Sequence, residues 1–183
     1  KMATPAALLY EETKQSKAID PHWYWREAIA PAWICPQNIQ RGADLRPALI
    51  PDPPQTTLFT AEGKPLGFTL GDWLGAKGTV DIAADRKTVT VRLEKLRPNA
   101  TYSLFKNHFD QQPIGFTPLD GTGSAKSFVN WATGKAKVSV QAPDVLTDAN
   151  AVLLVFHSDN AAHGMSRGEL GVTAHHQLIA RIP

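Results

Sequence analysis

Residues 79–94 read TVDIAADRKTVTVRLE, and this stretch decides the class of fold. Apolar and polar residues alternate from Thr79 to Ile82 and again from Thr88 to Glu94. A period of two is typical of a strand with one buried and one exposed face, and the segment Ala84–Lys87 between the two runs is typical of a turn. The stretch therefore predicts an antiparallel hairpin.

Four further segments downstream have the apolar and β-branched composition of strands. They are residues 101–107, 136–142, 151–157 and 172–182. We therefore predict a mainly β chain in which residues 79–183 form an antiparallel β-sandwich domain.

The segment LRPNATY, residues 96–102, places a proline turn between a leucine and a tyrosine that opens a strand. It resembles the corner of fibronectin-type and other immunoglobulin-like sandwiches, where a tyrosine near a strand start ties down the corner. The resemblance implies an immunoglobulin/fibronectin-like architecture and carries no function.

The first 78 residues predict a different organisation, which we expect to pack on the β-domain. Thr4-Pro5 and Asp20-Pro21 each have the pattern of a helix start, so two short N-terminal helices are expected. Half of the 14 prolines lie between Pro31 and Pro65. Because proline fixes φ and removes a hydrogen-bond donor, we expect an extended arm without regular structure.

The composition excludes several classes of protein. The apolar fraction is 43%, the charged fraction is 20% and the net charge is +2, as in an ordinary globular protein. The basic residues form no run, so no nucleic-acid partner is predicted. No apolar stretch reaches the roughly 20 residues of a membrane-spanning helix. The partner that remains to be considered is a small molecule, a glycan or another protein.

The chain opens with Lys1-Met2, so we interpret it as a processed precursor or as a chain that carries a tag remnant. It has no charged segment followed by an apolar one at its start, so any signal peptide has already been removed. We accordingly predict a periplasmic or secreted protein. Cys35 is the single cysteine, which rules out an intrachain disulfide, and its apolar neighbours indicate a buried thiol.

Histidines are the residues with the clearest chemical potential. Two predicted strands end in the pattern His-x-Asp, at His108 with Asp110 and at His157 with Asp159. In an extended chain, residues i and i+2 lie on one face about 6.6 Å apart, so an imidazole and a carboxylate so placed can ligate one cation.

Strict up-and-down alternation of the strands would bring both pairs to the same end of the sheet. The loop Ser158–Gly171, which carries His163, and the long connection Phe109–Lys135 would start at that end too. Long loops in compact domains are usually functional or mobile. A crossover between sheets would break this convergence.

The adjacent histidines at positions 175 and 176 fall on opposite phases of the last strand. His176 shares its phase with Val172, Leu178 and other apolar residues, so it is expected to be buried and hydrogen-bonded. His175 is expected to face solvent or a neighbouring loop.

These observations favour a metal site for copper or zinc at one end of the sandwich. Its predicted ligands are His108, Asp110, His157, Asp159, His163 and His175. No motif identifies a reaction, so enzymatic activity is left open.

Two alternatives remain at this point. One is a metal-free immunoglobulin-like module that recognises a protein or glycan through its long loops. The other is a metal-free enzyme in which His157 and Asp159 form an acid–base pair.

Overall fold

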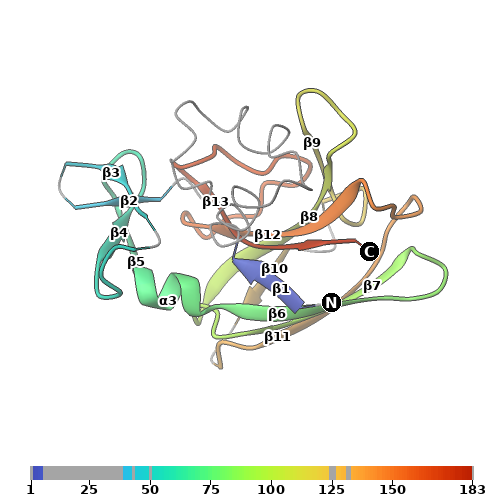
Figure 1. Ribbon diagram of the computed structural model, residues 1–183, viewed down its shortest axis with the longest axis horizontal. Coiled ribbons are helices and arrows are strands. Elements are labelled where there is room, and N and C mark those ends of the chain that lie inside the picture. Colours follow the sequence, from blue (N-terminus) through green and yellow to red (C-terminus); the bar gives the residue numbers. More distant parts are fainter. Residues whose placement is uncertain are drawn as a thin grey trace.

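The computed structural model describes residues 2–5, 39–42, 44–49, 51–123, 127–130 and 133–182. These residues form antiparallel β-sheets with almost no helix, as predicted for a mainly β chain (Figure 1). Most of the predicted N-terminal helices, the aromatic residues between positions 23 and 33, and Cys35 lie outside the described residues. Thr4 and Pro5 are described, and they belong to a strand instead of opening a helix.

The larger sheet has nine strands in the order β10-β8-β12-β13-β1-β6-β7-β11, with β9 also pairing with β8. Their bounds are β1 Met2–Pro5, β6 Lys77–Ile82, β7 Thr88–Glu94, β8 Ala100–His108, β9 Gly115–Pro118, β10 Ser127–Asn130, β11 Ala136–Gln141, β12 Asn150–His157 and β13 Ala174–Arg181. The hairpin predicted over residues 79–94 is confirmed as β6 and β7, and the four other predicted strands correspond to β8, β11, β12 and β13.

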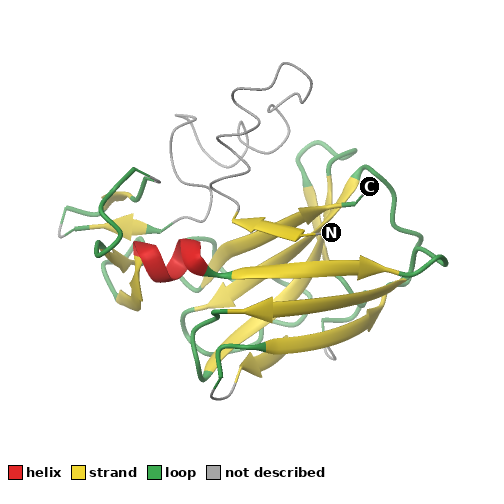
Figure 2. Ribbon diagram, turned by 60° about the horizontal axis from the view of Figure 1, so that its bottom comes forward, coloured by secondary structure: helices red, strands yellow, loops and turns green. Residues whose placement is uncertain are grey.

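Strand β1 joins the two halves of this sheet. Ala3 pairs with Gly78 of β6, while Thr4 pairs with Ile179 of β13. The half that contains β6, β7 and β11 packs on the half that contains β8, β12 and β13 (Figure 2). Their facing side chains form one apolar core, which includes Val91, Leu93, Tyr102, Leu104, Val152, Leu154, Phe156 and Leu178. The immunoglobulin-like form of this packing is not confirmed, because β1 makes one continuous sheet of the two halves.

The predicted tyrosine corner is present between β7 and β8. Tyr102 is fully buried, and its hydroxyl accepts a hydrogen bond of 3.0 Å from the backbone N–H of Arg97. Burial raises the pKa of the Tyr102 phenol above its usual range, so the group is neutral at physiological pH. Asn99 takes a left-handed conformation at φ 55°, which asparagine tolerates better than most residues.

The proline-rich stretch is not the extended arm that its composition suggests. It contains a four-stranded antiparallel sheet in the order β3-β2-β4-β5, built from β2 Gln40–Arg41, β3 Arg46–Pro47, β4 Thr57–Phe59 and β5 Pro65–Thr69. The strands are short, and their prolines stand at strand ends, where a missing N–H donor is tolerated. The prediction of no regular structure was therefore wrong for these residues.

This small sheet is followed directly by the helix α3 Leu70–Gly75, which has a capping box between Thr69 and Asp72. Trp73 in α3 is fully buried and contacts Phe156 of β12, with ring centroids 6.0 Å apart. The segment before residue 79 thus shares its core with the larger sheet, while the division into two domains stays a prediction.

None of the helices in the described part of the chain has the length and apolar character needed to cross a membrane.

Strands β12 and β13 are buried on both faces, and this positions the site described below. Along β12, Val152, Leu154 and Phe156 face the main core, whereas Leu153 and Val155 belong to a second apolar cluster on the outer face. Burial on both faces explains why residues 151–156 are continuously apolar instead of alternating.

Candidate metal centre

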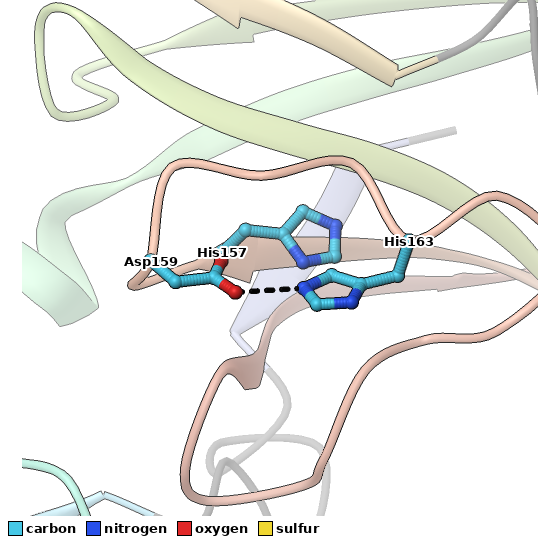
Figure 3. A group of neighbouring side chains, drawn as sticks. All are labelled: His157, Asp159 and His163. Atoms are coloured by element: carbon cyan, nitrogen blue, oxygen red, sulfur yellow. Dashed lines mark hydrogen bonds and ion pairs between the residues drawn. The ribbon is translucent and has the colours of Figure 1, made fainter.

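Three side chains meet where β12 ends. His157 is the last residue of that strand, and Asp159 and His163 lie in the loop of residues 158–173 that leads to β13. In Figure 3 the loop curves back over the end of the strand, so that the His163 ring lies beside the His157 ring. The two ring centroids are 5.1 Å apart, with 36° between the ring planes.

The ligand atoms of these three residues form a compact group. One nitrogen from each histidine and one carboxylate oxygen all lie within 4.8 Å of one another. Within the group, His163 Nε2 lies 3.0 Å from Asp159 Oδ2. In a tetrahedral site with metal–ligand distances of about 2.0–2.1 Å, neighbouring ligand atoms lie about 3.3–3.4 Å apart. The cluster therefore needs movements on the order of 1 Å to close on an ion.

His157 is the buried member of the group, with no exposed surface. Its Nε2 lies 2.7 Å from the Ser103 hydroxyl, whereas its Nδ1 is buried without a hydrogen-bond partner. Burial lowers the pKa of His157 to about 4; the nearby His163 contributes in the same direction, and Asp159 opposes both. The imidazole is thus neutral at pH 7, which is the form that binds a metal.

The loop that carries Asp159 and His163 is held by its own hydrogen bonds. Asp159 Oδ1 accepts from the backbone N–H of Ala161 at 3.1 Å, and the His163 carbonyl accepts from Ser166 N at the same distance. Gly168 lies against the His163 ring, because a Cβ at this position would be 3.1 Å from His163 Cδ2. These contacts limit where the His163 ring can move.

A second loop supports the first. Gly123 ends the turn after β9, where Asp120 Oδ1 accepts from the backbone N–H of both Thr122 and Gly123. A Cβ on Gly123 would lie 2.1 Å from the carbonyl oxygen of Gly164, so the two loops touch backbone to backbone. The connection Phe109–Lys135 had been predicted to start at this end of the sheet, but it starts at the opposite end, after His108. It reaches the loop of His163 only after β9 has returned along β8.

The other His-x-Asp pair lies elsewhere. Strands β8 and β12 are antiparallel neighbours, so His108 pairs with Asn150 at the start of β12 and His157 pairs with Thr101 at the start of β8. His108 and Asp110 are therefore at the opposite end of the sheet. The predicted convergence of both pairs was wrong because the intervening strand β11 pairs with β7 in the other half, and simple alternation fails.

His108 has a structural environment of its own. Its Nε2 lies 2.8 Å from the hydroxyl of Thr117 in β9. Partial burial lowers the pKa of His108, and the nearby Lys106 acts in the same direction. Among the described residues, no cluster of three ligating side chains includes His108 or Asp110.

The prediction that His175 faces solvent was wrong, although its ring does contact a neighbouring loop, since Nε2 lies 3.2 Å from the hydroxyl of Ser158. His175 is fully buried, and its ring packs against Trp73 and Phe156 at centroid distances of 6.4 and 5.9 Å. The cause is a β-bulge. Leu154 pairs with Leu178 while Val155 pairs with His176, which leaves Gln177 as an extra residue in β13. The residues of β13 before Gln177 therefore point to the opposite face of the sheet from the one that strict alternation predicts.

His176 is buried and hydrogen-bonded, as predicted, although on the outer face. Its Nε2 lies 2.9 Å from Nη1 of Arg167, which donates to it. Arg167 in turn lies over the ring of Phe116, 3.4 Å from the centroid. Burial, followed by the charge of Arg167, lowers the pKa of His176 well below its usual value, so the ring is neutral.

Of the six predicted ligands, the structure brings together His157, Asp159 and His163. His108 and Asp110 lie at the opposite end of the sheet, and the ring of His175 packs in the core instead of joining the group. Sequence reasoning missed Ser103 and the two supporting glycines. A serine inside a strand has no pattern that marks it, since only the pairing of β8 with β12 brings it to His157.

Two imidazole nitrogens and one carboxylate oxygen form a ligand set that suits a first-row transition metal. Three protein ligands leave one position of a tetrahedral site open for water or a substrate. Comparison of the chain with models of protein families, with curated proteins and with solved structures finds no match. The assignment of function therefore depends on the geometry of the site.

Proposed function

We propose that this protein binds zinc or copper through His157 Nδ1, a carboxylate oxygen of Asp159 and His163 Nε2. The observation that carries the proposal is the buried Nδ1 atom of His157, which has no hydrogen-bond partner although His157 belongs to a group of three ligating side chains. An unsatisfied buried polar atom costs about 1–3 kcal/mol, and a metal ion bound there would remove that cost.

Partial exposure of the other two ligands supports an accessible site. The side chains of His163 and Asp159 are 25% and 34% exposed, so an ion can enter from the solvent side and keep one position for an exchangeable ligand. Any metal-dependent reaction would use that position, by lowering the pKa of a bound water or by polarising a substrate oxygen.

We further propose that the protein is periplasmic or secreted. We also propose that the two packed halves of its larger sheet form an immunoglobulin-like sandwich.

The metal must be identified from the protein as it is purified. Nitrogen and oxygen ligands follow the Irving–Williams order, so Cu²⁺ will bind more tightly than Zn²⁺ in vitro whatever the native metal is. Elemental analysis of protein prepared without a histidine tag should find close to one equivalent of zinc or copper. Stoichiometric iron would keep the site but reject the proposed metals, because two histidines and a carboxylate also bind Fe²⁺.

A stability measurement tests whether the binding is specific to the folded site. A metal at 100 times its Kd adds about 2.7 kcal/mol to the free energy of unfolding. For a chain of this size, that corresponds to an increase in Tm of about 5–10 °C. The increase should disappear in His163→Ala and persist in His108→Ala, which removes an imidazole from the opposite end of the sheet.

Other results would reject the proposal. No bound metal, together with no change in Tm on adding zinc or copper, would rule out the site. Capture of a glycan or a protein that is unaffected by chelator and lost on shortening the loops would favour the metal-free binding module instead.

A further inference from the structure

We infer that Ser103 is a positioning residue that fixes the tautomer of His157, so that Nδ1 is the nitrogen offered to the metal. This inference rests on the proposed function. Ser103 lies on β8, where it pairs with Val155 of β12, and its side chain is on the same outer face of the sheet as His157. Both residues are buried, and Ser103 Oγ is 2.7 Å from His157 Nε2.

A neutral imidazole carries one proton, and its position decides whether the site can bind a metal. If Nε2 carries the proton and donates it to Ser103 Oγ, the lone pair of Nδ1 faces the other ligands. If Nδ1 carries the proton, Nε2 accepts from the serine hydroxyl and Nδ1 cannot bind an ion. Only the first arrangement is compatible with a metal among His157, Asp159 and His163.

The contacts of the two ring nitrogens also favour Nδ1. Nε2 is engaged by Ser103 on the side of β8, whereas Nδ1 is buried without a hydrogen-bond partner. Nδ1 is therefore the ring nitrogen that remains for an ion held with Asp159 and His163.

Metal-binding histidines usually donate their second ring N–H to a carboxylate or a backbone carbonyl. The carboxylate nearest in sequence, Asp159, contacts His163 instead, so a serine hydroxyl takes this role for His157. Loss of such an outer partner typically lowers metal affinity about 10- to 100-fold.

The test measures the tautomer and the affinity separately. Long-range ¹H–¹⁵N correlation spectra of the metal-free protein at pH 7 should show His157 protonated on Nε2. In Ser103→Ala the Nε2–H form should lose population, and the affinity for Zn²⁺ should fall about 10- to 100-fold. Ser103→Thr keeps a hydroxyl at the same place and should retain both properties.

A wild-type spectrum with the proton on Nδ1 would overturn the inference, and this result needs no variant and no metal. An unchanged tautomer together with an unchanged Zn²⁺ affinity in Ser103→Ala would overturn it as well. A wild-type protein that has the Nε2–H tautomer, loses it in Ser103→Ala and binds no metal would support the role of Ser103 in setting the tautomer. That result would reject the proposed function alone.

Discussion

The free energy of unfolding should fall as the pH is lowered from 7 to 4.5, because His157 takes up a proton in the unfolded chain but not in the folded protein. The imidazole has a pKa of about 4 in the folded protein, mainly because it is buried, and an ordinary value of 6.5 when unfolded. Between these values the unfolded chain binds a proton that the folded protein excludes. The contribution is therefore complete above about pH 6.5 and is lost as the pH falls toward 4.

The size of the effect follows from the two pKa values. A difference of about 2.5 between them corresponds to a maximum of about 3 kcal/mol, and roughly 2.5 kcal/mol of it is lost between pH 7 and pH 4.5. Urea unfolding of the metal-free protein at a series of pH values, with chelator present, measures the total pH dependence. His157→Phe keeps an aromatic ring at the site and removes the titrating group.

The difference in pH dependence between wild type and His157→Phe isolates His157 from other buried histidines such as His176. We expect the wild-type curve to be steeper by roughly 2.5 kcal/mol over this range. Curves that run parallel between pH 7 and pH 4.5 would show that His157 is not held neutral by burial, and the reasoning about its readiness to bind a metal would fail.

Three further substitutions test the supports of the site and the fold. Gly123→Ala should lower the affinity for Zn²⁺, measured by isothermal titration, because a Cβ there would displace the backbone at Gly164 beside His163; an unchanged Kd would show that the loops are not coupled. Tyr102→Phe removes the partner of the Arg97 N–H and should lower the free energy of unfolding by about 1–3 kcal/mol in urea titrations, and no loss would contradict the role of the corner. Thr69→Ala removes the N-cap of α3 and should cost about 0.5–2 kcal/mol in the same assay, with Thr69→Ser as the control that keeps the cap.

The strands were predictable because their signal is local. Alternation over residues 79–94 and the apolar runs near the C-terminus correspond to β6, β7, β12 and β13. The corner at Tyr102 was recognisable for the same reason, since its proline and tyrosine stand within seven residues. Regular structure in the proline-rich stretch was not predictable, because its short strands depend on pairing with each other and on a shared core.

The site was only half predictable. The pattern His157-x-Asp159 and the loop histidine His163 are visible in the sequence, and the structure brings them together. The position of His108 at the other end of the sheet, away from this site, follows from the pairing of β8 with β12, which are far apart in the sequence. The burial of His175 depends on one extra residue in β13, which no period-two analysis detects.

The central claim is that one metal ion binds at the end of β12. The most direct measurement is anomalous diffraction from crystals of untagged protein soaked in zinc or copper, with data collected on both sides of the metal's absorption edge. We expect a single strong anomalous peak about 2.0–2.2 Å from His157 Nδ1, from His163 Nε2 and from a carboxylate oxygen of Asp159. No peak at this position, or a peak held by other residues, would contradict the claim.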